Sequence, residues 1–111
     1  MRLAVEIVAD GQHARVTAST EDMTVSREFN ATALDELIAA LSRARSGLKE
    51  AVPKTLEPGH VVAAVADPAF VVTSTSTGFL LSIRHPGAGW LAFKLSKEAA
   101  SALRSGFPTE G

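Results

Sequence analysis

The sequence predicts an α+β domain in which a mostly antiparallel sheet of about six or seven strands carries two helices packed on one face. A strand that runs into a capped helix occurs twice, at residues 27–37 and 92–100, each time with a phenylalanine near the end of the strand. Segments of alternating apolar and polar residues, separated by short turn signals, precede both. The predicted order is therefore βββα followed by ββββα. Whether the chain contains a duplicated unit is left open, because the two groups differ in their predicted number of strands.

The composition fits one globular domain that covers residues 1–111, since domains typically contain about 100–150 residues. Hydrophobic residues make up 46% of the chain and charged residues 21%, as in ordinary globular proteins. Aromatic residues contribute only 5%. Aliphatic side chains must therefore fill the core, which favours helices that cover a sheet.

Charge and cysteine content exclude several classes of function. The 11 basic and 12 acidic side chains give a formal net charge of −1, which offers no long-range attraction for nucleic acid or an anionic membrane. The absence of cysteine excludes disulfides, thiolate metal ligands and thiol nucleophiles. No apolar stretch approaches the roughly 20 residues of a membrane-spanning helix. Glu6 interrupts the short apolar run that would otherwise resemble a signal peptide. We therefore expect a cytoplasmic protein.

Three strands are predicted in the first third of the chain. The pattern alternates along residues 2–9, as in a half-buried strand: Leu3, Val5, Ile7 and Ala9 alternate with Arg2, Ala4, Glu6 and Val8. Asp10-Gly11 then predicts a two-residue hairpin, because a type I′ turn requires positive φ at both central positions. A return strand is expected at 13–19 and, after a further turn, a third strand at 23–29.

A helix is predicted next, because leucine and isoleucine side chains recur at helical spacing along residues 34–48. Asn30 or Thr32 can cap its first turn. Gly47 can end this helix; otherwise it continues to Val52, which precedes a proline.

Four strands and a second helix are predicted in the remainder, after a linker-like stretch at residues 53–59. The strands are expected at residues 61–66, 70–75, 79–84 and 90–95. The second helix is expected from an N-cap at Ser96 to about Ser105, with Gly106 in the left-handed conformation after its end.

No motif for catalysis, cofactor binding or metal binding is recognisable. His13, His60 and His85 are not at metal-ligand spacing. There is no nucleophile elbow and no P-loop. The glycine pair at residues 87–89 precedes a strand, so the helix dipole that favours phosphate binding is missing. We therefore assign no catalytic, cofactor-binding or metal-binding residue, and an enzyme is the less favoured alternative.

The first candidate contact surface is the alternating run of threonine and serine at residues 73–77. It has no apolar face, so its register and burial are weakly specified. Thr73, Thr75 and Thr77 would lie along an exposed strand edge that accepts a strand from another chain. The alternative is a polar hairpin tip beyond the core.

The second candidate contact surface surrounds the loop at residues 85–89. This loop presents Arg84, His85 and Trp90, which are residue types found at interface hot spots. By alternation, Trp90 shares its face with Ala92 and not with the apolar residues of the last strand. The alternative role for Trp90 is a residue at the edge of the core.

The sequence thus predicts a small binding or regulatory module, such as an adaptor, an inhibitor or an immunity-type protein. Its expected partner is another protein or a second copy of the chain, joined through an edge strand; nucleic acid is not an expected partner. The alternative is a small ligand-binding protein or enzyme with a pocket between the first helix and the sheet, in which His60 or His85 acts as acid–base group. Polar side chains that converge on an apolar pocket would favour this alternative.

Overall fold

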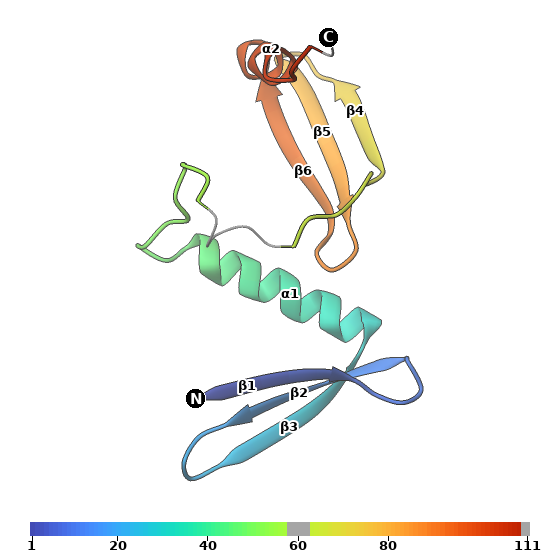
Figure 1. Cartoon of the computed structure of the whole chain (residues 1–111), viewed down its shortest axis with the longest axis vertical. Coiled ribbons are helices and arrows are strands. Elements are labelled where there is room, and N and C mark those ends of the chain that lie inside the picture. The colour runs from blue at the N-terminus through green and yellow to red at the C-terminus, as the bar shows by residue number, and fades with distance from the viewer. Residues whose placement is uncertain (58–62, 110–111) are drawn as a thin grey trace. The chain divides into compact units, whose positions relative to one another are not determined.

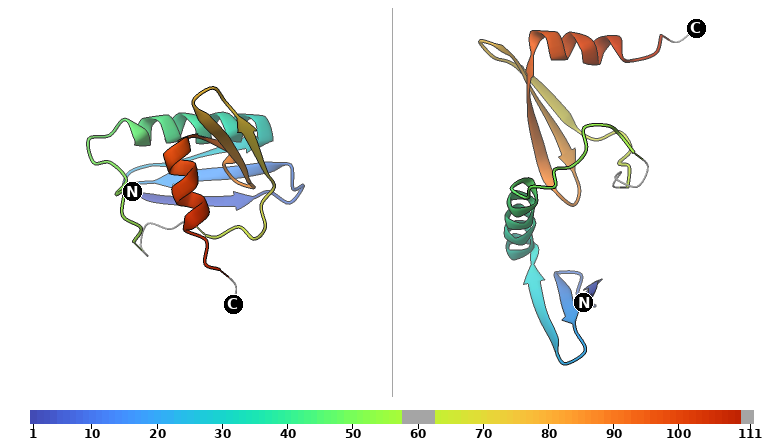
Figure 2. Two further views of the ribbon diagram at one scale, coloured as in Figure 1. Left: turned by 90° about the horizontal axis from the view of Figure 1, so that it is seen from above. Right: turned by 90° about the vertical axis from the view of Figure 1, so that its left-hand side faces the viewer.

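The computed structural model describes residues 1–57 and 63–109. The chain divides into two compact units, unit 1 (Met1–Lys54) and unit 2 (Thr55–Gly111). Within the described residues, each unit has three antiparallel strands followed by one helix, which can be traced in Figures 1 and 2. The α+β class and the antiparallel pairing are confirmed. The described strands form two three-stranded sheets, however, and not the single sheet of six or seven strands that the sequence predicted. The single domain stays a prediction.

Unit 1 contains sheet 1 and one helix. Its elements are β1 (Arg2–Ile7), β2 (His13–Ser19), β3 (Thr24–Asn30) and α1 (Ala31–Ser46), with the sheet order β1-β2-β3. Residues directly opposite each other in neighbouring strands share a face of the sheet. The apolar face of sheet 1 consists of Leu3, Val5, Ile7, Ala14, Val16, Ala18, Val25 and Phe29, together with Arg27. The opposite face is polar, as the period-2 pattern predicted.

Unit 2 contains sheet 2 and the second helix. Its elements are β4 (Phe70–Ser74), β5 (Gly78–His85), β6 (Gly89–Ser96) and α2 (Lys97–Ser105), with the sheet order β4-β5-β6. The apolar face of sheet 2 consists of Phe70, Val72, Phe79, Leu81, Ile83, Leu91, Phe93 and Leu95. A fourth strand was predicted at 61–66. Residues 63–66 form no strand, and residues 61–62 lie outside the described part. The described elements therefore give both units the order βββα.

The β1–β2 hairpin has a longer connection than the sequence predicted. β1 ends at Ile7 and β2 begins at His13. Gly11 has a φ of +70°, in the left-handed region, but Asp10 has no positive φ, which a type I′ turn would require. The carboxylate of Asp10 instead accepts a hydrogen bond from the backbone N–H of Gln12 at 2.8 Å. This hydrogen bond forms an Asx turn, which replaces the two-residue turn that the sequence predicted.

Side-chain caps begin both helices, as predicted. Oδ1 of Asn30 accepts a hydrogen bond from the N–H of Ala33 at 2.9 Å, which selects Asn30 over Thr32 as the cap. Oγ of Ser96 accepts from the N–H of Ala99 at 3.0 Å. Each bond satisfies one of the free N–H groups of the first helical turn.

A glycine caps the C-terminal end of each helix. α1 ends at Ser46 with Gly47 as its C-cap and does not continue to Val52. Gly106 caps α2 with a right-handed φ of −74°, so the left-handed conformation predicted for it was wrong. Its N–H still donates to the carbonyl of Ala102 at 3.0 Å, which extends the helical hydrogen-bonding pattern by one residue.

Candidate functional site

The hydrogen bonds between β4 and β5 show which main-chain groups of β4 are paired within the sheet and which face away from it. The N–H of Thr75 donates to the carbonyl of Gly78 at 2.9 Å, and the N–H of Arg84 donates to the carbonyl of Ala69 at 2.9 Å. In an antiparallel ladder, every second residue turns both of its main-chain groups toward the neighbouring strand. The odd-numbered residues from 69 to 75 therefore face β5.

The even-numbered residues of β4 face the other way. Because β4 is at the edge of sheet 2, Phe70, Val72 and Ser74 direct their N–H and C=O groups away from the sheet's other two strands. Such a row of main-chain groups is what an added strand requires. β4 thus has an unpaired edge within its sheet. The main-chain groups of Thr73, however, face β5 and do not belong to this edge.

The three candidate threonines have different positions. Thr73 lies within β4, whereas Thr75 and Thr77 lie in the turn that connects β4 with β5. Thr75 and Thr77 line a hollow of about 420 Å³ together with Lys94 and Ser96 of β6. Thr73 therefore lies in the edge strand but pairs its main chain with β5, whereas Thr75 and Thr77 lie at the tip of the β4–β5 hairpin.

Arg84 and Trp90 form a cross-strand pair between β5 and β6. Directly opposed side chains have Cβ atoms roughly 5 Å apart, so both belong to one surface, on the face of sheet 2 opposite its apolar face. Trp90 is 55% exposed. The distance along β5 from Gly78 to Arg84 is about 20 Å at roughly 3.3 Å per residue. The structure therefore does not bring this pair together with Thr75 and Thr77, which precede Gly78 in the turn, whereas Thr73 lies on the same face of sheet 2.

His85 stabilises the β5–β6 turn. Its Nδ1 accepts hydrogen bonds from the backbone N–H groups of Gly87 at 3.0 Å and Ala88 at 2.9 Å. A neutral imidazole that accepts at Nδ1 carries its proton on Nε2. These bonds give His85 a structural role in the loop next to Arg84. His60, the other histidine proposed as an acid–base group, lies outside the described residues.

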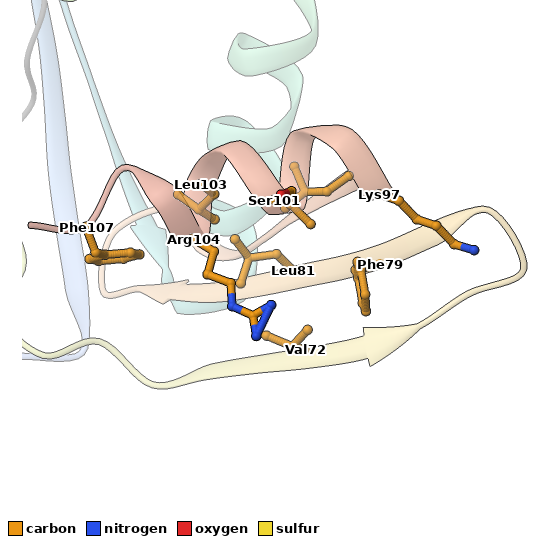
Figure 3. Close-up of a pocket in the computed structure, with 10 residues that line it drawn as sticks. Val72, Phe79, Leu81, Lys97, Ser101, Leu103, Arg104 and Phe107 are labelled. Carbon is orange, nitrogen blue, oxygen red and sulfur yellow. The ribbon is translucent and has the colours of Figure 1, made fainter. Parts of the chain in front are cut away.

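A groove of about 470 Å³ lies between α2 and the apolar face of sheet 2 (Figure 3). The sheet contributes Val72, Phe79, Leu81 and Leu95, α2 contributes Lys97, Ala100, Ser101, Leu103 and Arg104, and Phe107 follows the end of the helix. The groove thus lies beneath the second helix, whereas the sequence suggested the first. Ala100 and Leu103 have helical i, i+3 spacing, a signal that could have identified this surface.

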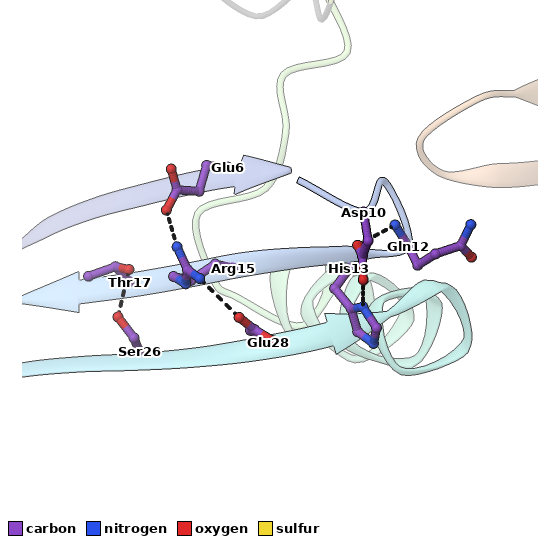
Figure 4. A network of polar contacts seen from close by, with 8 residues as sticks. All are labelled: Glu6, Asp10, Gln12, His13, Arg15, Thr17, Ser26 and Glu28. Atoms are coloured by element: carbon purple, nitrogen blue, oxygen red, sulfur yellow. Dashed lines mark hydrogen bonds and ion pairs between the residues drawn. The ribbon is translucent and has the colours of Figure 1, made fainter. Parts of the chain in front are cut away.

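An ion-pair row crosses the polar face of sheet 1 (Figure 4). Nη1 of Arg15 lies 2.7 Å from Oε1 of Glu6, and Nη2 of Arg15 lies 3.0 Å from Oε1 of Glu28. The hydrogen bonds that the Arg15 guanidinium donates to these carboxylates raise its pKa, and the bond to Glu6 has the larger effect. All three side chains are more than one-third exposed, so solvent screens both ion pairs and each contributes little to stability. The row supports the register of the three strands.

Asp10 permits a test of the first hairpin by pH (Figure 4). The hydrogen bond from the N–H of Gln12, and next that with His13 at 3.1 Å, lower the pKa of the Asp10 carboxyl. A carboxyl whose pKa falls on folding stabilises the fold above its unfolded pKa, about 3.9, and this stabilisation is lost as the pH falls through the lower folded pKa. We therefore expect an NMR titration of the Asp10 carboxyl to have its midpoint below about 3.9.

The matched variants for this titration are Gln12→Pro, which removes the backbone donor, and His13→Ala, which removes the ring. Both should raise the pKa of Asp10, and Gln12→Pro should raise it more. A wild-type midpoint at or above about 3.9 would contradict the hydrogen-bonded turn.

Within residues 1–57 and 63–109, no three His, Asp or Glu side chains are placed to hold a metal ion. Neither helix in this part of the chain combines the length and apolar character needed to cross a membrane. Comparison of the chain with models of protein families, with curated proteins and with solved structures found no match.

Proposed function

We propose that this chain is a small binding or regulatory module of the cytoplasm that acts through contact with another protein, and that the partner adds a strand to β4. The observation that carries the proposal is the row of main-chain groups that Phe70, Val72 and Ser74 direct away from β5. Main-chain hydrogen bonds would supply affinity, and the alternating side chains of the added strand would supply specificity.

The Arg84–Trp90 pair supports a second point of contact. Exposed Trp and Arg side chains are the types most enriched among residues that dominate binding energy. They lie on the face of sheet 2 opposite its apolar face, so a partner at the β4 edge could reach them only by extending across that face. With a net charge of −1, the chain is expected to hold its partner mainly by hydrogen bonds and apolar contacts, which resist salt.

Val72→Pro tests the proposed strand addition. Proline removes an N–H that points away from β5, and proline is tolerated on edge strands at such positions. We expect the far-UV circular dichroism spectrum to stay unchanged while the partner is lost. The assay is a pull-down from lysate of the source organism at low and high salt, with retained proteins identified by mass spectrometry.

The control is Val72→Ala, which shortens the same side chain but keeps its N–H. We expect wild type and Val72→Ala to retain one stoichiometric protein at both salt concentrations, and Val72→Pro to lose it. Equal retention by the proline and alanine variants would contradict strand addition. Retention of nucleic acid alone, lost at high salt, would contradict the protein-contact function.

A small-ligand-binding function is the alternative, and the groove beneath α2 is the observation that favours it. Its volume of about 470 Å³ falls in the range of roughly 300–1,000 Å³ that is typical of ligand sites. The cationic side chains of Lys97 and Arg104 border an apolar floor, which suits an apolar ligand with an anionic group. Saturable calorimetric binding of dodecanoate, weakened by Arg104→Ala, would favour this alternative.

A further inference from the structure

His85 closes the turn between β5 and β6 with a single ring nitrogen. Its Nδ1 accepts hydrogen bonds from the backbone N–H groups of Gly87 at 3.0 Å and Ala88 at 2.9 Å. The ring lies against the turn, because a Cβ on Gly87 would meet Cε1 and Nδ1 of His85 at 3.4 Å and 3.5 Å. The neighbouring cross-strand pair is Arg84 with Trp90. The conformation of this turn therefore depends on one titratable group beside the exposed Trp90.

Both hydrogen bonds require the neutral ring. A neutral imidazole with its proton on Nε2 accepts at Nδ1, whereas a protonated imidazole carries N–H groups at both nitrogens and accepts at neither. Protonation would direct a new N–H at the N–H groups of Gly87 and Ala88, so both bonds would be lost and donors would face donors. The bonds thus hold the turn closed while His85 is neutral and are lost as the pH falls. Histidine is the side chain whose charge ordinarily changes between about pH 5 and 8.

The charged groups around the ring do not compensate for an added positive charge. On β5, Arg84 precedes His85 and is itself positive, and the residues of β6 beside the turn are uncharged. In the segment before β4, Asp67 lies two residues before Ala69, whose carbonyl accepts from the N–H of Arg84. α2 lies at the opposite end of sheet 2 from this turn (Figure 1). His85 forms no ion pair with any of the described residues, so no carboxylate among them holds the protonated ring in the place of the neutral one.

We propose that the β5–β6 turn is a proton-sensitive switch. With His85 neutral, the turn is closed and fixes the end of the hairpin at which Arg84 and Trp90 pair. With His85 protonated, the N–H groups of Gly87 and Ala88 are released to solvent, and the pair loses the support of a closed turn. The switch is a property of unit 2 alone. Its consequence for binding rests on the proposed function: a contact through Arg84 and Trp90 would weaken in acid.

An NMR titration of the purified full-length chain between about pH 8 and 5 tests this switch. At the upper end, we expect the ring of His85 to carry its proton on Nε2 alone. As the pH falls, the amide protons of Gly87 and Ala88 should move upfield with the same midpoint as the ring, because an amide proton moves upfield when its hydrogen bond is lost. The fluorescence of Trp90, the only tryptophan, should change with that midpoint as well.

His85→Asn and His85→Ala are the matched variants. The side-chain oxygen of asparagine can accept a hydrogen bond in place of Nδ1 and does not titrate, so Trp90 should keep its high-pH fluorescence at every pH. Alanine offers no acceptor, so the fluorescence of Trp90 should match the low-pH signal at every pH. His13→Ala removes a histidine of unit 1 and should leave the wild-type transition unchanged.

Amide shifts of Gly87 and Ala88 that do not follow the titration of the His85 ring would overturn the proposal. A wild-type transition of Trp90 fluorescence in His85→Asn would also overturn it. If circular dichroism shows His85→Ala to be unfolded, wild type and His85→Asn decide. Because neither readout involves a partner, a pull-down that retains no protein would contradict the proposed function and leave the switch standing.

Discussion

Gly78→Ala is expected to disrupt sheet 2 and to lower the free energy of unfolding by about 3 kcal/mol. A Cβ atom on Gly78 would overlap the carbonyl oxygen of Leu95, and the Cα of Ser96 would lie 3.1 Å from it. Both neighbours are backbone atoms of β6, so they cannot rotate away as the end of a flexible side chain could. The methyl group would force β5 and β6 apart at their first pair of residues.

Urea denaturation followed by the fluorescence of Trp90 provides the measurement, since Trp90 is the only tryptophan and lies in β6. Gly106→Ala is the matched control in the same unit. A Cβ at Gly106 would meet its nearest atoms at 3.4 Å, and the φ of −74° suits any residue, so its effect should stay within about 0.5 kcal/mol. Equal unfolding midpoints for the two variants would contradict the close approach of β5 and β6.

Thr75→Pro is expected to destabilise the β4–β5 hairpin by about 1–3 kcal/mol. The N–H of Thr75 donates to the carbonyl of Gly78 at 2.9 Å, and proline has no N–H to replace it. Because Gly78 is buried, its carbonyl would lose a partner where water has little access. Urea denaturation with the same fluorescence signal should report the lower stability.

Two control variants test whether the effect of Thr75→Pro arises from the lost backbone N–H. Thr75→Val removes the hydroxyl but keeps the N–H, so its stability should match wild type within about 0.5 kcal/mol. Val72→Pro removes an N–H that faces away from β5 and should destabilise much less than Thr75→Pro. If Thr75→Pro and Val72→Pro had the same stability, the assignment of inward and outward main-chain groups on β4 would be wrong.

The Thr75 variant also shows where sequence and structure differ at the candidate site. From sequence, the run at residues 73–77 could equally be a pairing edge or a hairpin tip. The hydrogen bonds between β4 and β5 divide the run at residues 73–77. Thr73 belongs to the strand, and the N–H of Thr75 closes the turn. The main-chain groups that face outward belong to Phe70, Val72 and Ser74, and of these only Ser74 lies in the run. Residue type alone could not reveal this, because threonine and valine are equally suited to strands.

Local features were predictable from the sequence because local hydrogen bonds and side-chain alternation produce them. Asn30 and Ser96 cap their helices through bonds to N–H groups three residues away. The period-2 patterns correctly indicated which residues of a strand share a face, and in sheet 1 they separated apolar from mostly polar side chains. Arg84 and Trp90 became neighbours because a short hairpin joins their strands.

Features that depend on distant segments required the tertiary structure. Alternation indicates which residues of a strand share a face, but it does not state which strand lies beside it or where a sheet ends. The division into two sheets, the edge position of β4 and the groove beneath α2 all depend on such pairing and packing. The sequence thus determined the class, the strand faces and the helix caps. Tertiary structure decided which main-chain groups of each sheet stay unpaired within its unit, because strand order determines which strand lies at an edge.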